Sequence, residues 1–211
     1  MSIADIRKDY QLKSLVESEV AKDPFAQFSV WWEEAVQSAI VEVNAMALST
    51  VSPEGKPSSR IVLLKGYTEE GFVFFTNYTS DKGKQIEQNQ HVSLLFFWKE
   101  LERQVRIEGT ASKIATAESD AYFNSRPVGS RLGAWASPQS QKIADRAILD
   151  QELEKITAQF QEHEITRPPH WGGYRVVPTR IEFWQGRSSR LHDRILYEQV
   201  DQQWQISRLA P

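Results

Sequence analysis

The feature that most constrains the fold is a series of short strand-like runs separated by turn residues. Val, Ile, Phe, Tyr and Trp are frequent in these runs, and such residues favour β-strands. Consecutive antiparallel strands with helices around them are typical of a closed or partly closed barrel, which removes unpaired sheet edges. We therefore expect an α+β fold dominated by an antiparallel β-barrel. The predicted strands are residues 45–51, 60–65, 72–76, 92–98, 103–114, 173–177, 180–184, 195–200 and 204–209.

Helices are expected around this sheet. Residues 29–41 carry apolar side chains at helical spacing, and Ser29 is placed as a possible N-cap. Ser80 can cap a shorter helix over residues 81–89. Further helices are predicted over residues 117–125 and 141–161.

The length and composition favour one domain. The 211 residues and a hydrophobic content of 40% are enough for a single buried core. We expect residues 1–211 to form one domain, with residues 1–25 as a mobile N-terminal segment.

Composition also excludes several kinds of site. The chain has no cysteine, which removes disulfides and thiolate chemistry, and its four histidines show no metal-ligand spacing. The net charge of −3 argues against nucleic-acid binding. No apolar stretch approaches the roughly 20 residues that span a bilayer, and the N-terminus lacks an apolar signal region. We expect a cytoplasmic protein with no metal and no membrane contact.

Residues 181–194, IEFWQGRSSRLHDR, combine aromatic residues, arginines, a histidine and acids. An unpaired buried guanidinium is too costly to keep, so this segment is not ordinary core. Part of its positive charge can bind a ligand outside the chain. A solvated hairpin is an equally good interpretation of this segment alone.

The same segment contains E-F-W-Q-G at residues 182–186 and R-L-H-D-R at residues 190–194. Further motifs follow the order RIVLLK at residues 60–65, LERQVR at 101–106, YFNSRP at 122–127, GAWAS at 133–137, WGGYRV at 171–176 and SRLAP at 207–211. Over nearly its whole length the chain resembles the pyridoxine/pyridoxamine 5′-phosphate oxidase family, flavin enzymes with the FMN-binding split-barrel fold.

The resemblance implies a reaction and an assembly. The expected activity is FMN-dependent oxidation of pyridoxine 5′-phosphate or pyridoxamine 5′-phosphate to pyridoxal 5′-phosphate. O₂ would accept the electrons and give H₂O₂. The expected assembly is a homodimer with FMN at the subunit interface.

The resemblance also implies cofactor-binding positions. Arginine, lysine and hydroxyl groups suit the FMN phosphate, and donors near the ring favour its reduction. Asp81 stands where the family often has Arg, and Phe75 where it often has Tyr. The expected FMN-binding residues are Arg60, Ile61, Val62, Leu63, Leu64, Lys65, Phe75, Thr76, Lys82, Gln104, Gln139, Ser140, Trp184 and Arg194.

A second set of positions is implied for the substrate. Arg190 and His192, two apart on a possible strand, would orient the pyridine ring and control charge as the catalytic pair. Arg187 is expected to face solvent. Arg7 and Tyr10 would belong to the N-terminal segment that closes over substrate. The expected substrate-binding residues are Arg7, Tyr10, Lys65, Tyr122, Arg126, Ser130, Arg190, Leu191 and His192.

Two other functions fit much of the same pattern. A related split-barrel flavin reductase would keep Arg60, Lys82 and the flavin. It would not need the four residues Lys65, Tyr122, Arg126 and Arg190 together. A non-catalytic protein that binds FMN or pyridoxal 5′-phosphate is the other alternative. Taken singly, the cations are also consistent with ordinary surface charges, and Trp184 with a core aromatic residue.

Overall fold

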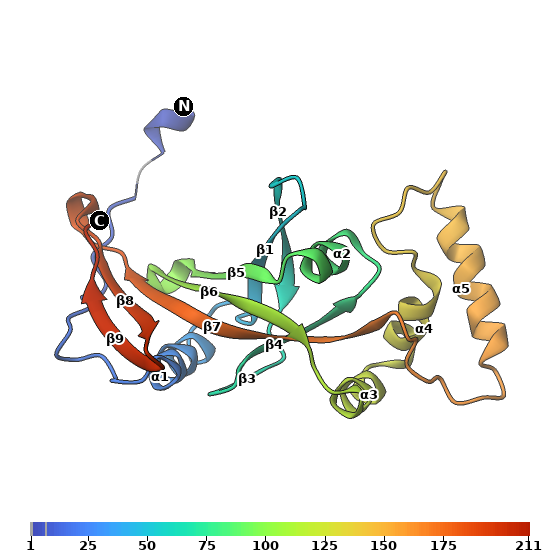
Figure 1. The fold of residues 1–211 in the computed structure, drawn as a ribbon. Helices are drawn as coiled ribbons and strands as arrows, with labels where there is room; N and C mark the ends of the chain where they lie inside the picture. Colours follow the sequence, from blue (N-terminus) through green and yellow to red (C-terminus); the bar gives the residue numbers. More distant parts are fainter. Residues whose placement is uncertain (1, 7) are drawn as a thin grey trace.

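A computed structural model describes residues 2–6 and 8–211 (Figure 1). Its centre is one antiparallel sheet of nine strands, which confirms the expected α+β class. Along the sheet the order is β2-β1-β5-β6-β7-β4-β3, and β8 and β9 continue from β7. The strands are β1 (Ala45–Val51), β2 (Pro57–Leu63), β3 (Gly66–Thr68), β4 (Gly71–Asn77), β5 (His91–Trp98), β6 (Arg103–Lys113), β7 (Trp171–Gln185), β8 (Asp193–Val200) and β9 (Gln203–Arg208).

The sheet curls because the strands at the two ends of this order, β2 and β3, are almost consecutive in sequence. β2 and β3 lie at opposite ends of the strand order, yet β2 ends at Leu63 and β3 begins at Gly66. The connection is hydrogen bonded on both sides. Leu64 N–H donates to the carbonyl of Asn44, and Lys65 N–H donates to the carbonyl of Val73, both at 2.8 Å. The result is a half-barrel, within the expected range of closed or partly closed forms.

β7 is one long strand where the sequence predicts two, at residues 173–177 and 180–184. Pro178 interrupts the apolar alternation, and it has no N–H to donate to the ladder. The register shifts between Glu108 and Gly109 of β6 opposite this point, so the two strands stay paired through a bulge. A Cβ on Gly109 would collide with the carbonyl of Val177.

The first long helix, α1 (Pro24–Val36), begins and ends earlier than residues 29–41. Asp23 is its N-cap and accepts hydrogen bonds from the backbone of Phe25 and Ala26, with Pro24 in the first turn. Ser29 is therefore inside the helix, where its hydroxyl donates to the carbonyl of Phe25. The prediction of Ser29 as N-cap is wrong, because Asp23 followed by Pro24 starts the helix before Ser29.

The other helices partly match the predictions. The structure contains α2 (Asp81–Gln88), α3 (Thr116–Ser125), α4 (Val128–Ala136) and α5 (Ala147–Gln159), and short 3-10 turns η1 (Ile3–Asp5), η2 (Lys99–Leu101) and η3 (Ser188–Arg190). Ser80 caps α2 as expected. α5 is shorter than residues 141–161. α4 was not predicted, since Gly129 and Gly133 weaken its helical signal.

The main core packs residues of α1 against residues of the sheet. The ring of Phe28 packs 5.0 Å from that of Phe72 and 5.5 Å from that of Phe96, centroid to centroid. α4 and α5 form a smaller apolar cluster near the start of β7, away from β8 and β9 (Figure 1). Within residues 2–6 and 8–211, none of the helices has both the length and the apolar character needed to cross a membrane.

Candidate functional site

One cavity of about 510 Å³ opens where β2, β4 and the starts of α2 and α4 meet. Its walls come from segments far apart in sequence, which the curl of the sheet brings together. Most of the expected cofactor and substrate residues line it. They are Arg60, Ile61, Val62, Leu63, Lys65, Phe75, Thr76, Lys82, Tyr122, Arg126, Ser130 and Gln139.

Arg60 on β2 supplies a fixed positive charge to this cavity. Its guanidinium donates to the carbonyl of Leu48 (3.1 Å) and to the hydroxyls of Thr50 (2.6 Å) and Ser58 (2.7 Å). All three acceptors are neutral, so they orient the guanidinium without cancelling its charge. Burial lowers the pKa of Arg60, and the Asp81 carboxylate partly offsets this effect.

Lys82 lies in the first turn of α2 and adds a second cation. Its Nζ donates to Oε1 of Gln139 at 2.9 Å and to the Ser80 hydroxyl at 3.3 Å. Burial, and then the charge of Arg60, lower the pKa of Lys82, whereas Asp81 raises it. Among the described residues, neither cation has a carboxylate within salt-bridge distance. Together with the helix N-terminus, the pair suits a bound anion.

A second cationic group lines the same cavity beside an aromatic stack. The Phe75 and Tyr122 rings stack at 3.9 Å, and the Arg126 guanidinium lies 4.6 Å from the centre of the Trp171 ring. Nη1 of Arg126 is buried and has no hydrogen-bond partner in the described part of the chain. A buried guanidinium donor that is left unpaired suits an incoming anion.

Trp171 is a cavity residue that the sequence reasoning did not assign. It is the first residue of β7 and of the WGGYRV motif, so the motif itself was the available signal. Asn77 and Pro127 also line the cavity without having been predicted. Trp171 holds Arg126 by stacking, which makes the position of the guanidinium depend on the start of β7.

Arg190 and His192 lie in a different cavity of about 550 Å³, together with Tyr10. The prediction that they lie on a strand is wrong. Arg190 ends the short turn η3, and Ser189 and Arg190 both adopt left-handed backbone conformations, with φ of 55° and 61°. Non-glycine residues in this region are strained, and such strain often occurs at functional sites. The turn still places both side chains along one cavity.

His192 is held in a defined state. The backbone N–H of Arg187 donates to its Nδ1, and the hydrogen-bond pattern therefore assigns the proton of the neutral ring to Nε2. Burial and then the Arg190 charge lower the pKa of His192, and Asp193 opposes them. The imidazole also packs 4.6 Å from the Trp184 ring. A neutral ring with Nε2–H can donate a hydrogen bond to a ligand.

Gln104, Trp184 and Arg194 lie in register across β6, β7 and β8, as a row on one face of the sheet. Arg194 is held by Glu182, with Nε to Oε1 at 2.7 Å and Nη2 to Oε2 at 3.1 Å. These hydrogen bonds raise the pKa of Arg194. Arg187, expected to face only solvent, instead forms an ion pair with Asp193 at 3.3 Å.

Several expected site residues lie outside both cavities. Leu64 is in the core, with 4% of its surface exposed, and Leu191 is exposed to solvent. Ser140 is also exposed and has a positive φ of 70°. Arg7 lies outside the described residues. Within the described ranges, no cluster of His, Asp and Glu could hold a metal ion.

The two cavities have no lining residue in common, and each includes a residue at or next to an opposite end of β7. Trp171, the first residue of β7, lines one cavity, and Arg187, which follows its end, lines the other. A strand rises about 3.3 Å per residue, so the 15 residues of β7 span roughly 45 Å along the strand. One chain therefore separates the expected substrate residues into two groups.

Comparisons with known proteins cover the whole chain. Residues 32–160 match the family described as pyridoxamine 5′-phosphate oxidase, and residues 171–211 match the pyridoxine 5′-phosphate oxidase C-terminal dimerisation region. The pyridoxine/pyridoxamine 5′-phosphate oxidase of Acaryochloris marina is 56% identical over 210 residues, covering 100% of this chain and 96% of the relative. The corresponding protein of Synechocystis sp. is 55% identical over 211 residues, covering 100% and 99%.

Solved structures show the same fold. PhzG from Burkholderia lata, in complex with tetrahydrophenazine-1-carboxylic acid, has a TM-score of 0.88 and 30% identity, covering 95% of this chain and 99% of its own. A pyridoxamine 5′-phosphate oxidase-related, FMN-binding protein from Nostoc punctiforme has a TM-score of 0.71 and 19% identity, covering 91% and 100%. The second likeness concerns the fold alone.

Proposed function

The chain belongs to the pyridoxine/pyridoxamine 5′-phosphate oxidase family, and from this premise we propose which of its residues bind the cofactor and the substrate. The protein is an FMN-dependent oxidoreductase that converts pyridoxine 5′-phosphate or pyridoxamine 5′-phosphate to pyridoxal 5′-phosphate. The chemistry that bound FMN supplies is acceptance of two electrons from the substrate and their transfer to O₂, which gives H₂O₂. The residues of the chain bind, orient and shield the reactants.

In this proposal Arg60 and Lys82 hold the FMN phosphate, with Gln139 and Thr76 beside them. The supporting observation is that both cations face one cavity without a carboxylate partner among the described residues. The donor types fit a phosphate dianion: a guanidinium, an ammonium and a hydroxyl. The row of Gln104, Trp184 and Arg194 is proposed to contact the flavin ring.

Lys65, Tyr122, Arg126 and Ser130 are proposed to bind the substrate phosphate. The unpaired Nη1 of Arg126 carries this assignment, because a buried guanidinium donor needs an acceptor that the described residues do not supply. A flavin reductase acting on an unphosphorylated substrate would have no use for this second cationic group. The group therefore favours the oxidase over that alternative.

Arg190 and His192 are proposed to orient the pyridine ring and to control charge beside it. His192 keeps its proton on Nε2, so it is suited to donate a hydrogen bond to the substrate. Arg190 adds a positive charge at the same wall. Positioning of the reacting carbon is the largest contribution that such residues make to a hydride transfer.

We further propose a homodimer whose active sites each combine the Arg126 cavity of one subunit with the Arg190 segment of the other. Residues 171–211 match a dimerisation region, and one chain keeps the two groups at opposite ends of β7. Ile61 and Phe97 are 67% and 53% exposed, and their apolar side chains suit an interface. A cytoplasmic location stays a prediction.

The activity is tested by following H₂O₂ during turnover of pyridoxine 5′-phosphate and of pyridoxamine 5′-phosphate. Light scattering of the FMN-loaded protein measures the subunit number in the same preparation. We expect a yellow dimer that produces peroxide with both substrates. A yellow protein that makes no peroxide would favour the non-catalytic binding protein, and a monomer would contradict the shared site.

A further inference from the structure

Glu102, between η2 and β6, is buried and conformationally strained. Its side chain is 3% exposed, and its backbone adopts a left-handed conformation with φ of 54°. A buried carboxylate needs compensating partners, and a non-glycine residue at positive φ costs of the order of 1 kcal/mol. A buried carboxylate and a positive φ persist only where the surrounding structure fixes them. The partners of Glu102 therefore indicate the role of this residue.

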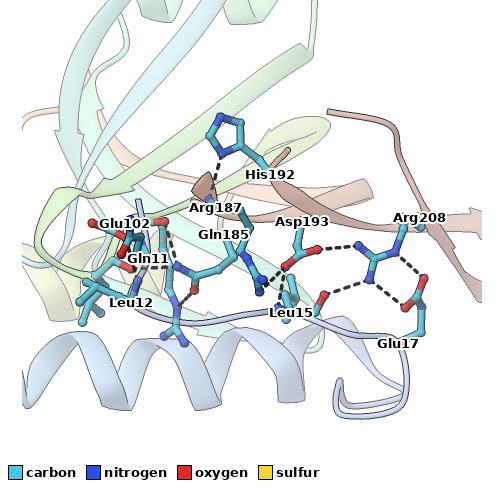
Figure 2. A network of polar contacts seen from close by, with 12 residues as sticks. Gln11, Leu12, Leu15, Glu17, Glu102, Gln185, Arg187, His192, Asp193 and Arg208 are labelled. Atoms are coloured by element: carbon cyan, nitrogen blue, oxygen red, sulfur yellow. Dashed lines mark hydrogen bonds and ion pairs between the residues drawn. The ribbon is translucent and has the colours of Figure 1, made fainter. Parts of the chain in front are cut away.

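Residues 8–17 form a segment that we call the N-terminal strap, and the carboxylate of Glu102 contacts three of them, Lys8, Gln11 and Leu12 (Figure 2). Oε2 accepts the backbone N–H of Gln11 at 2.8 Å and that of Leu12 at 3.1 Å. Oε1 pairs with Nζ of Lys8 at 3.1 Å. Across the described ranges, these are all the hydrogen bonds and ion pairs of this carboxylate. Its compensation therefore comes from the strap.

The backbone of Glu102 is joined to the loop that carries the catalytic pair. Its carbonyl accepts the N–H of Gly186 at 2.7 Å and Nε2 of Gln185 at 3.2 Å. One residue thus holds the strap through its side chain and the start of the 186–192 loop through its main chain. If the strap moves where Glu102 holds it, the position of the strap relative to His192 changes.

Tyr10 of the strap lies against this loop. Its ring is 5.8 Å from that of Trp184, edge to face, and 6.1 Å from that of His192. The approach is close enough that a Cβ on Gly186 would lie 2.7 Å from Cγ of Tyr10. Tyr10, Arg190 and His192 line the same cavity. The wall that Tyr10 gives to this cavity depends on where the strap is held.

We propose that Glu102 is a positioning residue for the oxidation, acting by fixing the strap so that Tyr10 stays packed against Trp184 and His192. This inference rests on the proposed function, which places the substrate beside Arg190 and His192. Glu102 does not touch the substrate. It limits the freedom of the one aromatic side chain that the strap contributes to the cavity.

The protonation state agrees with this role. Burial raises the pKa of Glu102, but hydrogen bonds from the Leu12 N–H, from Lys8 and from the Gln11 N–H outweigh it and lower the pKa overall. The carboxylate is therefore charged at neutral pH and accepts all three donors. Charge-assisted hydrogen bonds of this kind are stronger than neutral ones.

The test compares Glu102→Gly and Glu102→Gln in the FMN-loaded protein. Glycine accepts the positive φ and removes the carboxylate, whereas glutamine keeps one acceptor oxygen. We expect Glu102→Gly to raise KM for pyridoxine 5′-phosphate about tenfold, or about 1.4 kcal/mol, with kcat and FMN affinity nearly unchanged. The KM of Glu102→Gln should lie between the KM of Glu102→Gly and that of the wild type. Faster hydrogen exchange at the Gln11 and Leu12 amides should accompany the change in KM.

Glu70→Gln is the matched control, because Glu70 also loses an ion pair, with Arg175, and has no hydrogen bond or ion pair to the strap among the described residues. In a Tyr10→Ala background, Glu102→Gly should have no further effect on KM, because Glu102 acts through Tyr10. Additive effects of the two substitutions would overturn the proposal. So would an unchanged KM in Glu102→Gly when the wild type turns over substrate. A wild type without turnover would instead contradict the proposed function.

Gly186→Ala covers the case in which Glu102→Gly does not fold. An added methyl group would lie 2.7 Å from Cγ of Tyr10, so the ring must shift, while the carboxylate of Glu102 is kept in the sequence. Gly186→Ala should raise KM by a similar factor while FMN stays bound. Unchanged KM in both Gly186→Ala and Glu102→Gln would also refute the proposal.

Discussion

The backbone N–H of Arg187 donates to Nδ1 of His192 across 3.1 Å, so this nitrogen is held as an acceptor. Protonation of the ring would place a hydrogen on Nδ1 and break that bond. Burial and the Arg190 charge also disfavour the imidazolium, and they outweigh Asp193. We predict that the pKa of His192 in the folded protein lies below its ordinary value of 6.5.

The sign of the pH dependence follows from this shift. As the pH falls through 6.5, the unfolded chain takes up a proton that folded His192 does not, so the free energy of unfolding decreases until the lower folded pKa is reached. An NMR titration of the imidazole, assigned with a His192→Asn variant, measures the pKa directly. A pKa at or above 6.5 would show that the hydrogen bond to Nδ1 does not keep the His192 imidazole neutral.

Arg60→Ala should weaken FMN binding, because it removes a cation whose partners are all neutral. A hydrogen bond to a charged group contributes about 1.5–3 kcal/mol, so the Kd should rise roughly 10- to 100-fold. Quenching of FMN fluorescence on binding gives the Kd. Lys84→Ala, an exposed cation on α2, is the control and should bind as the wild type does. Equal losses in both variants would mean that only the net charge matters.

Arg126→Lys should separate substrate binding from cofactor binding. Lysine keeps the charge but loses the planar guanidinium that stacks 4.6 Å from the Trp171 ring. We expect KM for pyridoxine 5′-phosphate to rise about tenfold while the Kd for FMN stays unchanged. Arg146→Lys makes the same exchange at an exposed position. A parallel loss of FMN would place Arg126 at the cofactor phosphate instead.

The predicted strands agree with the structure where apolar alternation is continuous, because alternation directly reports a half-buried sheet. Predictions fail where a local signal competes with the pattern. Pro178 breaks the alternation of β7, although a bulge in the neighbouring strand keeps it paired. Ile40 continued the helical spacing of α1 but packs against the core from beyond the helix end.

The site could be predicted only as a set of residues. Motifs indicated Lys65 and Arg126 as well as Arg190 and His192, but not that one chain keeps these pairs in separate cavities. That separation depends on the length of β7 and on long-range strand pairing, which local sequence does not encode. The role of Glu102 could not be predicted for a similar reason, since its partners Gln11 and Leu12 lie about 90 positions earlier in the chain.

Glu17 and Arg208 should make stability depend on pH in the acid range. Hydrogen bonds from Arg208 lower the pKa of Glu17 from 4.5 to about 2. The stabilisation is therefore complete above pH 4.5 and is lost as the pH falls toward 2. Urea unfolding of wild type and Glu17→Gln should show a difference that shrinks over this interval. Glu19→Gln, an exposed neighbour, is the control, and a Glu17→Gln difference that stays constant would contradict the pairing.

Mixing two inactive variants tests whether Arg126 and Arg190 act from different subunits. Arg126→Ala and Arg190→Ala homodimers each lack one group in both sites. A mixed dimer has one site that lacks both groups and one that is intact, if the groups come from opposite subunits. Random mixing makes half of the dimers mixed, so roughly one quarter of wild-type activity should return after co-refolding. If both arginines served the same site from one chain, no intact site could form, and activity would not return.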